Sequence, residues 1–319
     1  DGNDDGGDEG DDGDGVDGEG CCTHEAITPC LDAFLCYDVA ASKGTPRFSP
    51  VPGVHLVDWL EDARFTVTEP RALCNPADLE GEGVHDPVTH LDRYQIVPVF
   101  KRAPRAKAAG VSVETALGVV QLDVVRGDKL LVPAAKSLAT PPPALEGAHV
   151  DHFKCYDVVP SRGAAKFPQG LHLTLADQFT RAPKVFAVAG PKHLCAAADE
   201  DGGGVEDACA ALLCYGVKAG AGEPRFSRTK GVRVRDDFGL RQVDVVAEDE
   251  ACLPAVVNDR TCLARGFACA VDGECSTGHC AGGVCCETAC DTPCHACLGS
   301  LTGEPHGTCA PIVRRRCSQ

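Results

Sequence analysis

The chain has 319 residues, a formal net charge of −17, 35 glycines, 22 prolines and only 16 aromatic residues. An acidic balance of this size argues against a nucleic-acid partner, because phosphates would be repelled. No stretch approaches the ~20 apolar residues that a membrane-spanning helix needs, so we expect no transmembrane segment. The 21 cysteines would be a liability in a reducing cytosol, so we expect an exported protein that is extracellular, periplasmic or on the cell surface.

The start of the chain has no apolar signal-peptide core, and the sequence contains no methionine. The first residue is therefore not an initiator, and we interpret the chain as a mature or trimmed form. A signal peptide or a lipid-anchoring cysteine upstream of residue 1 is a hypothesis.

Residues 1–20 form an acidic tail of ten acids and eight glycines, which supplies −10 of the net charge. This composition cannot bury enough apolar surface to offset its ordering entropy, so we expect a disordered, self-repelling tether. An EF-hand-like calcium loop is the alternative, with ligands at Asp1, Asn3, Asp5 and Asp12 around Gly6. No amphipathic helix precedes this segment and its twelfth position lacks the bidentate Glu, so we expect weak calcium binding at most.

One six-residue motif recurs along the chain, and we call it the Cys-Tyr motif. It reads Phe-Leu-Cys-Tyr-Asp-Val at 34–39 and returns at 153–158 and 212–217, with a degenerate copy, Leu-Asp-Arg-Tyr-Gln-Ile, at 91–96. The tyrosines of successive copies lie 57, 62 and 59 residues apart. Most of the protein is therefore four copies of one unit.

Each repeat holds period-2 stretches that predict half-buried strands. These stretches are 54–57 and 65–68 in the first repeat, 111–114 and 120–124 in the second, 171–175 and 185–188 in the third, and 232–235 and 243–245 in the fourth. Together with the Cys-Tyr motif, they predict three short strands in each repeat.

Three repeats carry a second cysteine 38 or 40 residues after the first, whereas the second repeat lacks both. The second repeat has Arg93 in place of the first cysteine and, on our alignment, Val132 in place of the second. Because the two cysteines are missing together, we predict that each of the other repeats closes its own disulfide: Cys36 with Cys74, Cys155 with Cys195, and Cys214 with Cys252. Each bridge should stabilise its repeat by about 4 kcal/mol on the chain-entropy model.

A second level of repetition pairs the repeats, since Tyr37 lies 119 residues before Tyr156 and Tyr94 lies 121 before Tyr215. We therefore predict an all-β fold with two β-sandwich or barrel-like domains, each built from two repeats. The predicted parts are an acidic tether at 1–20, a lead-in at 21–33, a β-domain at 34–137, a Pro-rich linker at 138–151, a second β-domain at 152–255, and a cysteine-rich disulfide module at 256–319.

The C-terminal module holds eleven cysteines between residues 262 and 317, and its internal disulfide connectivity cannot be deduced from spacing. The sequence Cys294-His295-Ala296-Cys297, with Cys286 and Cys290, is the strongest zinc candidate. In an oxidising compartment we expect disulfides to form there instead. Because 21 is an odd number, one thiol lacks a partner within the chain, and Cys21, Cys22, Cys30 and Cys209 are the first candidates.

The repeats resemble an uncharacterised repeat domain of predicted secreted proteins and lipoproteins of environmental Gram-negative bacteria. The resemblance covers residues 28–255 and lies in the Cys-Tyr motif, Pro46-Arg47-Phe48 and its copies, the turn Asp177-Gln178-Phe179, the closing Leu194-Cys195 and the stretch 131–138. The tail from Cys262 is similar to cysteine-rich modules of such surface proteins. The resemblance implies export and no established activity.

The sequence lacks a nucleophile elbow, a His-Glu-Xaa-Xaa-His zinc motif and a phosphate-binding glycine loop. His149 and His152 are a conceivable metal pair, but we interpret them as solvated, and we predict no catalytic residue, no metal site and no cofactor. Our first hypothesis is a non-catalytic exported surface protein with a structural or adhesive role. The second is a glycan-binding or protein-binding module in which Trp59 stacks on the ligand. An enzyme with a site assembled across repeats is the third.

Overall fold

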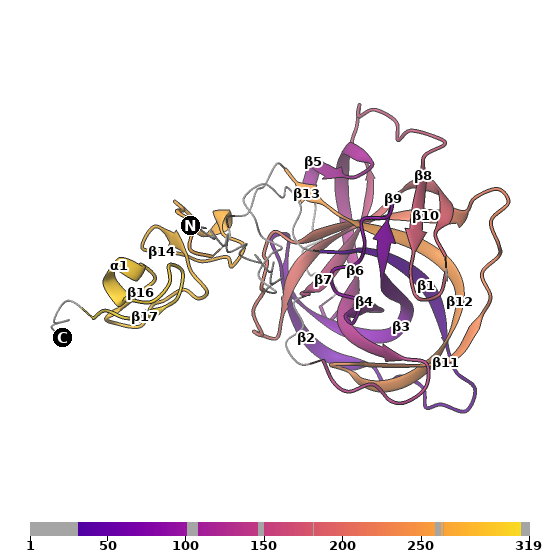
Figure 1. Cartoon of the computed structure of the whole chain (residues 1–319), viewed down its shortest axis with the longest axis horizontal. Coiled ribbons are helices and arrows are strands. Elements are labelled where there is room, and N and C mark those ends of the chain that lie inside the picture. The colour runs from indigo at the N-terminus through magenta and orange to yellow at the C-terminus, as the bar shows by residue number, and fades with distance from the viewer. Residues whose placement is uncertain are drawn as a thin grey trace, which may run out of the picture.

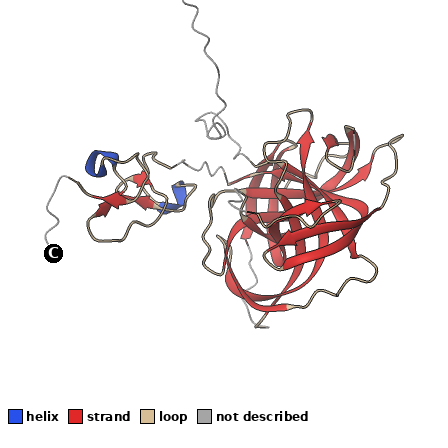
Figure 2. Cartoon of the chain, turned by 60° about the horizontal axis from the view of Figure 1, so that its bottom comes forward, coloured by secondary structure: helices blue, strands red, loops and turns tan. Residues whose placement is uncertain are grey.

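The computed structural model describes residues 31–100, 108–145, 150–180, 182–258, 263 and 265–313. The three strands of the first repeat are β1 (Ala33–Ala41), β2 (Val51–Val57) and β3 (Asp62–Leu79), and those of the second are β4 (His90–Pro98), β5 (Ala108–Thr115) and β6 (Gly118–Ser137). The third repeat contributes β7 (His152–Pro160), β8 (His172–Ala176) and β9 (Lys184–Glu200), and the fourth β10 (Ala211–Ala219), β11 (Thr229–Asp236) and β12 (Gly239–Pro254), which β13 (Val256–Val257) follows. The all-β prediction is confirmed (Figure 2).

Eight of these strands close into one barrel (Figure 1). The order around the ring is β1, β3, β4, β6, β7, β9, β10 and β12, every neighbouring pair is antiparallel, and β12 pairs with β1 to complete the circle. The last strand of each repeat is long, at 16 to 20 residues. Its first part pairs in a hairpin with the strand before it. Its second part is one of the eight strands of the barrel wall, which we call staves.

The predicted division into two β-domains is therefore wrong. Repeat 1 pairs with repeat 4 through β1 and β12, and repeat 2 pairs with repeat 3 through β6 and β7. The Pro-rich segment that we predicted as an interdomain linker joins two adjacent staves, and Arg233 and Arg235 donate hydrogen bonds to its carbonyl oxygens at Ala139 and Pro142. In one closed ring every barrel strand has backbone hydrogen-bond partners on both of its edges, whereas two separate open sheets would leave edge strands unpaired.

The Cys-Tyr motif supplies both faces of the barrel wall. Because successive strand residues point to opposite sides, Cys36 faces the lumen, where it joins the cluster of the other motif cysteines, while Tyr37 lies in the outer core. The four motif tyrosines are all 0% exposed, although each carries a hydroxyl. Each buried hydroxyl therefore needs a polar partner.

Three of the four hydroxyls find this partner in the hairpin turn of the repeat two places away. Tyr156 of repeat 3 donates to Asp58 of repeat 1 at 2.5 Å, and Tyr94 of repeat 2 donates to Asp236 of repeat 4 at 2.7 Å. The hydroxyl groups of Tyr215 and Thr115 lie 2.9 Å apart. At the fourth site Asp177 of repeat 3 lies near Tyr37 of repeat 1, and burial and this carboxylate raise the pKa of Tyr37 well above its usual range, but the Tyr37 hydroxyl makes no hydrogen bond among the described residues.

The docked hairpins also pair with the stave ends of the same opposite repeats. β2 pairs with β9 and β8 pairs with β3, which joins repeats 1 and 3 in both directions. In the same way, β11 pairs with β6, and β5 pairs with β13, the continuation of β12. The structure therefore links neighbouring repeats through the ring and alternate repeats through the hairpins.

A third contact to the motif tyrosines comes from the Pro-Arg-Phe element of the preceding repeat. Phe48 lies 5.2 Å from Tyr94, Phe167 lies 5.7 Å from Tyr215, and Phe226 lies 5.0 Å from Tyr37, measured between ring centroids. The last of these contacts runs from repeat 4 back to repeat 1. The partly buried phenylalanines therefore pack against the outer core, and the contact of Phe226 with Tyr37 joins the last repeat to the first.

A cation accompanies the aspartate at the docking sites of Tyr156 and Tyr94. Lys154 is 0% exposed and lies 3.8 Å from Asp58 and 2.5 Å from Glu61, and Arg241 contacts Asp236 at 2.7 Å. At the Tyr215 site the turn residue is the uncharged Thr115, which also accepts a hydrogen bond from the N–H of Leu117. The charged and neutral sites thus offer a comparison within one molecule.

The C-terminal region is a short-stranded module held by disulfides. Its elements are η1 (Asp272–Glu274), β14 (Cys280–Ala281), β15 (Val284–Cys285), β16 (His295–Ala296), α1 (Gly299–Thr302) and β17 (Ala310–Pro311). Its bridges are Cys269–Cys280, Cys275–Cys285, Cys286–Cys297 and Cys290–Cys309, which confirms the disulfide-rich prediction. The predicted boundary at 256 is wrong by a few residues, because β13 still pairs with the hairpin strand β5 of repeat 2. Within the described residues, no helix has the length and apolar character needed to cross a membrane.

We expect a fragment of residues 34–137 not to fold on its own, because its edge strands lose the pairings that β12 and β7 supply. Far-UV circular dichroism and denaturant titration should show a cooperative transition for the full chain and none for the fragment. A cooperative transition in the fragment would restore the two-domain arrangement.

We expect Tyr156→Phe to lower the free energy of unfolding by about 2 kcal/mol, because the hydroxyl hydrogen-bonds a buried carboxylate. Tyr215→Phe removes a bond to a neutral hydroxyl, so its loss should be about 1 kcal/mol. Chemical denaturation of the two variants in parallel measures the difference. Equal losses would contradict the role of the buried charge.

Candidate functional site

The lumen of the barrel is filled at one end by apolar side chains. Phe34, Leu91, Phe153 and Leu212 occupy the same position in the four Cys-Tyr motifs and are at most 1% exposed. They pack against the six cysteines of the repeats. In repeats 1, 3 and 4 the first cysteine lies two residues further along the same strand, and the second lies directly opposite the first on the neighbouring strand. This end of the lumen therefore has no space for a ligand.

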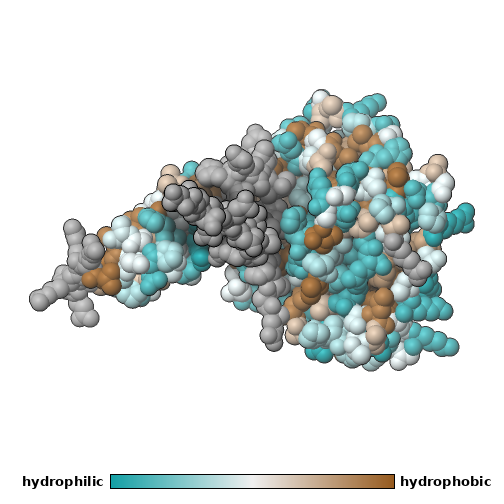
Figure 3. Space-filling view, viewed as in Figure 1, coloured by the Kyte–Doolittle hydropathy of each residue, from teal (hydrophilic) through white to brown (hydrophobic). Residues whose placement is uncertain are grey.

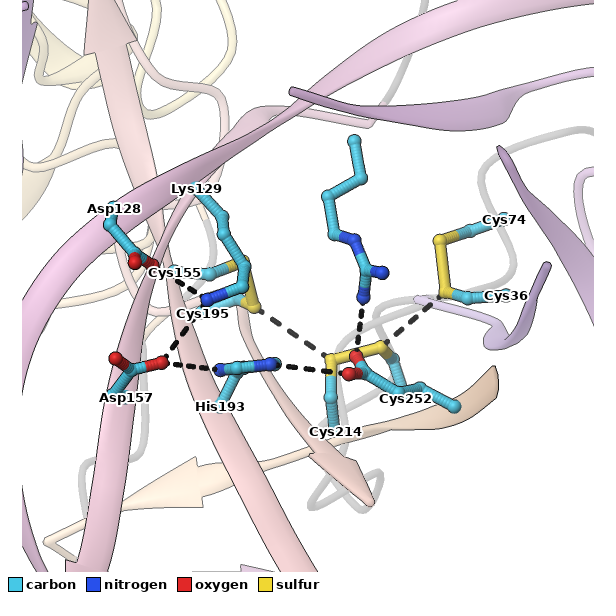
Figure 4. The surroundings of a disulfide bond; sticks show 12 residues. Cys36, Cys74, Asp128, Lys129, Cys155, Asp157, His193, Cys195, Cys214 and Cys252 are labelled. Carbon is cyan, nitrogen blue, oxygen red and sulfur yellow. Dashed lines mark hydrogen bonds and ion pairs between the residues drawn. A yellow bond between two sulfur atoms is a disulfide. The ribbon is translucent and has the colours of Figure 1, made fainter. Parts of the chain in front are cut away.

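The three predicted disulfides are all present, as Cys36–Cys74, Cys155–Cys195 and Cys214–Cys252. Each joins directly opposed residues of two neighbouring strands. The bridges also contact one another, because Cys36 Sγ lies 3.7 Å from Cys252 Sγ and Cys195 Sγ lies 3.8 Å from Cys214 Sγ (Figure 4). Six sulfurs thus form one continuous row across the barrel.

The second repeat interrupts this row. Arg93 stands directly opposite Leu131 in the pairing of β4 with β6, so Leu131 is the structural counterpart of the second cysteine. Our alignment to Val132 was therefore wrong by one residue, and a one-residue shift in a strand reverses the side-chain direction. Val132 packs in the outer core with Tyr94.

An ion pair takes the place of the missing bridge. Arg93 donates from Nη1 to Glu250 at 2.7 Å and from Nη2 to Asp249 at 2.8 Å, which joins repeat 2 to repeat 4 across the lumen. The side chains of Arg93 and Glu250 are only 9% and 2% exposed. Sequence reasoning treated Arg93 only as an absent cysteine and missed this contact.

Beyond the disulfide row, the lumen becomes polar. The next inward-facing positions carry Asp38, Gln95, Lys129, Asp157, His193 and Glu250. Lys129 lies 2.6 Å from Asp128 and 3.1 Å from Asp157, and His193 lies 3.2 Å from both Asp157 and Glu250 (Figure 4). We call these six residues the charged ring.

Opposite charges stabilise the most buried member of the charged ring. Burial alone would raise the pKa of Glu250, but a hydrogen bond from His193 and the positive charges of Arg93 and Lys192 outweigh it and hold the pKa well below its usual range. Lys192 Nζ lies 2.6 Å from Glu250 Oε1. The surrounding positive charges thus favour the ionised form of Glu250.

A cavity of about 400 Å³ opens beside the charged ring, and we call it the chamber. Its polar lining comes from Asp38, Arg71, Arg93, Gln95 and Lys129. Val39 and Arg71 also line a larger cavity of about 1060 Å³, which we call the groove and which runs on between β1, β3, β11 and β12. A ligand in the chamber could therefore extend into the groove.

One buried donor of Arg93 has no acceptor among the described residues. Arg93 Nε is buried and makes no hydrogen bond among the described residues, although both terminal nitrogens of the same guanidinium are engaged. An unpaired buried N–H normally costs about 1–3 kcal/mol. Asp38 is the chamber's acceptor, and burial and the nearby Asp249 carboxylate raise the pKa of Asp38 above its usual value.

Trp59, our predicted stacking residue, lies in the turn between β2 and β3 and is 37% exposed. It is not among the residues that line the chamber or the groove. Its role in ligand binding stays a prediction, and the structure does not bring it together with the charged ring.

The predicted calcium loop and three of the four candidate odd thiols, Cys21, Cys22 and Cys30, lie outside the described residues. The fourth, Cys209, is disulfide-bonded, and Cys294 is the free, exposed thiol of the described part of the chain. In the zinc candidate, Cys286 and Cys297 bond to each other and Cys290 bonds to Cys309. These three sulfurs therefore cannot act as thiolate ligands.

Among the described residues, one imidazole and two carboxylates form another group with metal-ligand chemistry. His152 Nε2 lies 2.7 Å from Glu200 and 3.0 Å from Asp237, so our interpretation of His152 as solvated was wrong. His149 lies outside the described residues. Burial opposes a charge on His152, but hydrogen bonds to Asp237 and Glu200 prevail and raise its pKa to about 9. A proton occupies this group at neutral pH, and a metal ion would have to displace it.

Comparison of the chain with protein-family models, with curated proteins and with solved structures finds no match.

We expect His152→Gln to lose stability in a pH-dependent way. Because folding raises this pKa from about 6.5 to about 9, the ion pair stabilises the protein fully below pH 6.5 and ceases to do so as the pH rises through 9. The variant should be less stable by an amount on the order of 2 kcal/mol at pH 6, after allowance for the exposed Asp237. Denaturant titrations at pH 6 and pH 9.5 measure this. A deficit independent of pH would contradict it, and His55→Gln at the exposed His55–Asp62 pair is the control.

Proposed function

We propose that the protein is an exported, non-catalytic binding protein that holds its ligand at the open, polar end of the barrel. The observation that supports this most directly is the chamber, which lies where the second repeat lacks a disulfide and which leads into the groove. This choice favours our second hypothesis, a binding module, over a purely structural or adhesive role. The two roles are compatible if the ligand is part of an extracellular surface.

The disulfides support export. The structure contains seven bridges among residues that it describes, three of them inside the barrel. Bridges of this number persist in an oxidising compartment and are rare in a reducing one. The resemblance to secreted repeat proteins and lipoproteins points the same way and stays a prediction.

The charged ring favours binding over catalysis. A general acid or base needs a nitrogen or oxygen directed at the substrate. Both ring nitrogens of His193 lie 3.2 Å from carboxylates, and Lys129 is held between Asp128 and Asp157. Tyr94 also lines the chamber, but its hydroxyl donates to Asp236. The ionisable groups thus neutralise one another and keep the open end rigid.

Recognition at this end would be polar. On the face seen in Figure 3, apolar and polar residues are interspersed over the barrel and do not form one continuous apolar patch. A hydroxyl-bearing or charged ligand fits such a surface better than an apolar one.

A screen of the oxidised full chain against arrayed extracellular glycans and peptides tests the proposal. We expect saturable binding that Arg71→Ala weakens about tenfold, because this side chain lines both the chamber and the groove, while its 57% exposure lets the fold tolerate the change. Arg64→Ala is the matched control, since Arg64 is 54% exposed and lines neither. Absence of any saturable ligand, or equal loss in both variants, would refute ligand binding at this end.

A further inference from the structure

The docking site of Tyr37 departs from the other three. At those sites a side chain of the docked turn hydrogen-bonds the hydroxyl of the motif tyrosine. Asp177, the corresponding turn residue here, instead accepts a hydrogen bond from Asn75 Nδ2 at 2.7 Å, and the buried Tyr37 hydroxyl has no partner among the described residues. The carboxylate therefore contacts Asn75 in place of the tyrosine.

Asn75 and its second partner, Lys136, each occur in one repeat. Asn75 directly follows the second cysteine of repeat 1, where the other repeats have Val132, Ala196 and Leu253. Lys136 lies five residues after Leu131, the counterpart of that cysteine in repeat 2, and the other repeats have Leu79, Glu200 and Val257 at this place. The fold of a repeat therefore requires neither side chain.

Lys136, Asn75 and Asp177 bring together three different repeats. Lys136 Nζ, on β6, donates a hydrogen bond to Asn75 Oδ1, on β3, at 2.7 Å. The carbon Cγ lies about 1.2 Å from that oxygen, so Nζ is at most about 3.9 Å from Cγ. Asn75 is 0% exposed, and the centroid of the Phe179 ring lies 4.3 Å from Nζ. An amine is thus held beside an amide carbon that water does not reach.

The surroundings of Lys136 favour its uncharged form. The buried Lys154 and Lys184 each lie 2.5 Å from a carboxylate. Among the described residues Lys136 makes no such ion pair, and its hydrogen-bond partner is a neutral amide. Burial lowers the pKa of Lys136 to about 7, although the charge of Asp177 opposes this shift. A large share of the amine is therefore uncharged at neutral pH, and the uncharged amine is the form that attacks a carbonyl carbon.

Asp177 is placed to move a proton during such an attack. Its Oδ1 accepts hydrogen bonds from the backbone N–H groups of Phe179 and Thr180, each at 2.9 Å, which holds the carboxylate in the turn. Its Oδ2 faces Asn75 Nδ2, the nitrogen that would leave. Because the attacking and leaving nitrogens are bonded to the same carbon, one carboxylate can reach both in turn.

We propose that Lys136 and Asn75 join in an intramolecular amide bond, an isopeptide cross-link between β6 and β3. The lone pair of Nζ attacks Asn75 Cγ to give a tetrahedral intermediate, and the bond from Cγ to Nδ2 breaks as the carbonyl re-forms. Asp177 takes a proton from the attacking nitrogen and passes it to the leaving nitrogen, which departs as ammonia. An amine and a carboxamide thus give a substituted amide and ammonia, with no oxidant, reductant or co-reactant.

The cross-link removes a charge from a buried site. His90 is 2% exposed, its Nδ1 has no partner among the described residues, and burial and the positive charge of Lys136 hold its pKa well below the usual value. A buried cation without a carboxylate partner is costly, whereas an amide is neutral. The new bond also ties repeat 2 to repeat 1, and repeat 2 is the repeat in which Arg93 and Leu131 replace the disulfide. This inference is independent of ligand binding.

Mass spectrometry of the unaltered full chain tests the inference directly. The purified chain is folded alone, and then reduced and denatured. We expect an intact mass below that of the sequence by one ammonia molecule, and trypsin should release residues 72–93 joined to residues 130–154. Lys184, a buried lysine whose partner is the carboxylate of Glu248, should be unlinked in the same digest and is the internal control.

Variants assign the roles of the three residues. Asn75→Ala and Lys136→Arg should each keep the full mass of their own sequences. Asp177→Asn retains both reacting groups, but linking after refolding should be at least about a hundredfold slower, because the proton relay is lost. Asp62→Asn changes a carboxylate that is 72% exposed and should link as fast as the parent. Circular dichroism confirms that each variant is folded.

The outcomes separate the steps of the inference. A folded parent chain with the full mass of its sequence would overturn the cross-link. Loss of one water molecule, with Lys136 joined to Asp177, would overturn the assignment of Asn75. An unchanged rate of linking in folded Asp177→Asn would overturn the role of Asp177 as the relay.

Discussion

The structure depends on the opposite directions of two adjacent side chains. In each motif the side chain before the tyrosine points into the lumen. The tyrosine side chain points outward and packs against the hairpin of the repeat two places away. Strand geometry fixes this alternation. In repeats 1, 3 and 4 the cysteine of the dipeptide therefore forms a disulfide in the lumen, while the tyrosine contacts a hairpin on the outer side. Because the tyrosines are fully buried, the hydrogen bonds of Tyr94, Tyr156 and Tyr215 make the docking specific as well as apolar.

Closure of the ring follows from the same contacts. A repeat of about 60 residues buries too little surface to be stable alone. Here each repeat borders two others in the ring and exchanges hairpins with the third, so none has its own core. The contact of Phe226 with Tyr37 and the pairing of β12 with β1 join the end of the repeat region to its beginning. Stability is therefore shared, and the disulfides cross-link staves that the ring already holds together.

The departure from symmetry in the lumen lies beside the polar end of the barrel. Where three repeats place a disulfide, the second places a buried arginine that pairs with the fourth repeat. The neutral Tyr215–Thr115 site shows that the fold tolerates variation on its outer side as well. On the outer side, Thr115 in place of an aspartate conserves the hydrogen bond to the tyrosine. In the lumen, Arg93 in place of a cysteine lines the chamber.

The sequence by itself determined the repeats, their three strands each, the all-β class and the pairing of six cysteines, because these depend on local alternation and on spacing within one repeat. It did not determine which repeats share a sheet. That was decided by contacts such as those of β1 with β12 and of Arg93 with Glu250, which lies 157 residues away. Alternation of apolar and polar residues predicts that a strand has an inner and an outer face, but it does not predict which strand pairs with each of its edges. The charged ring and the chamber exist only once eight staves have closed, and only the tertiary structure could reveal them.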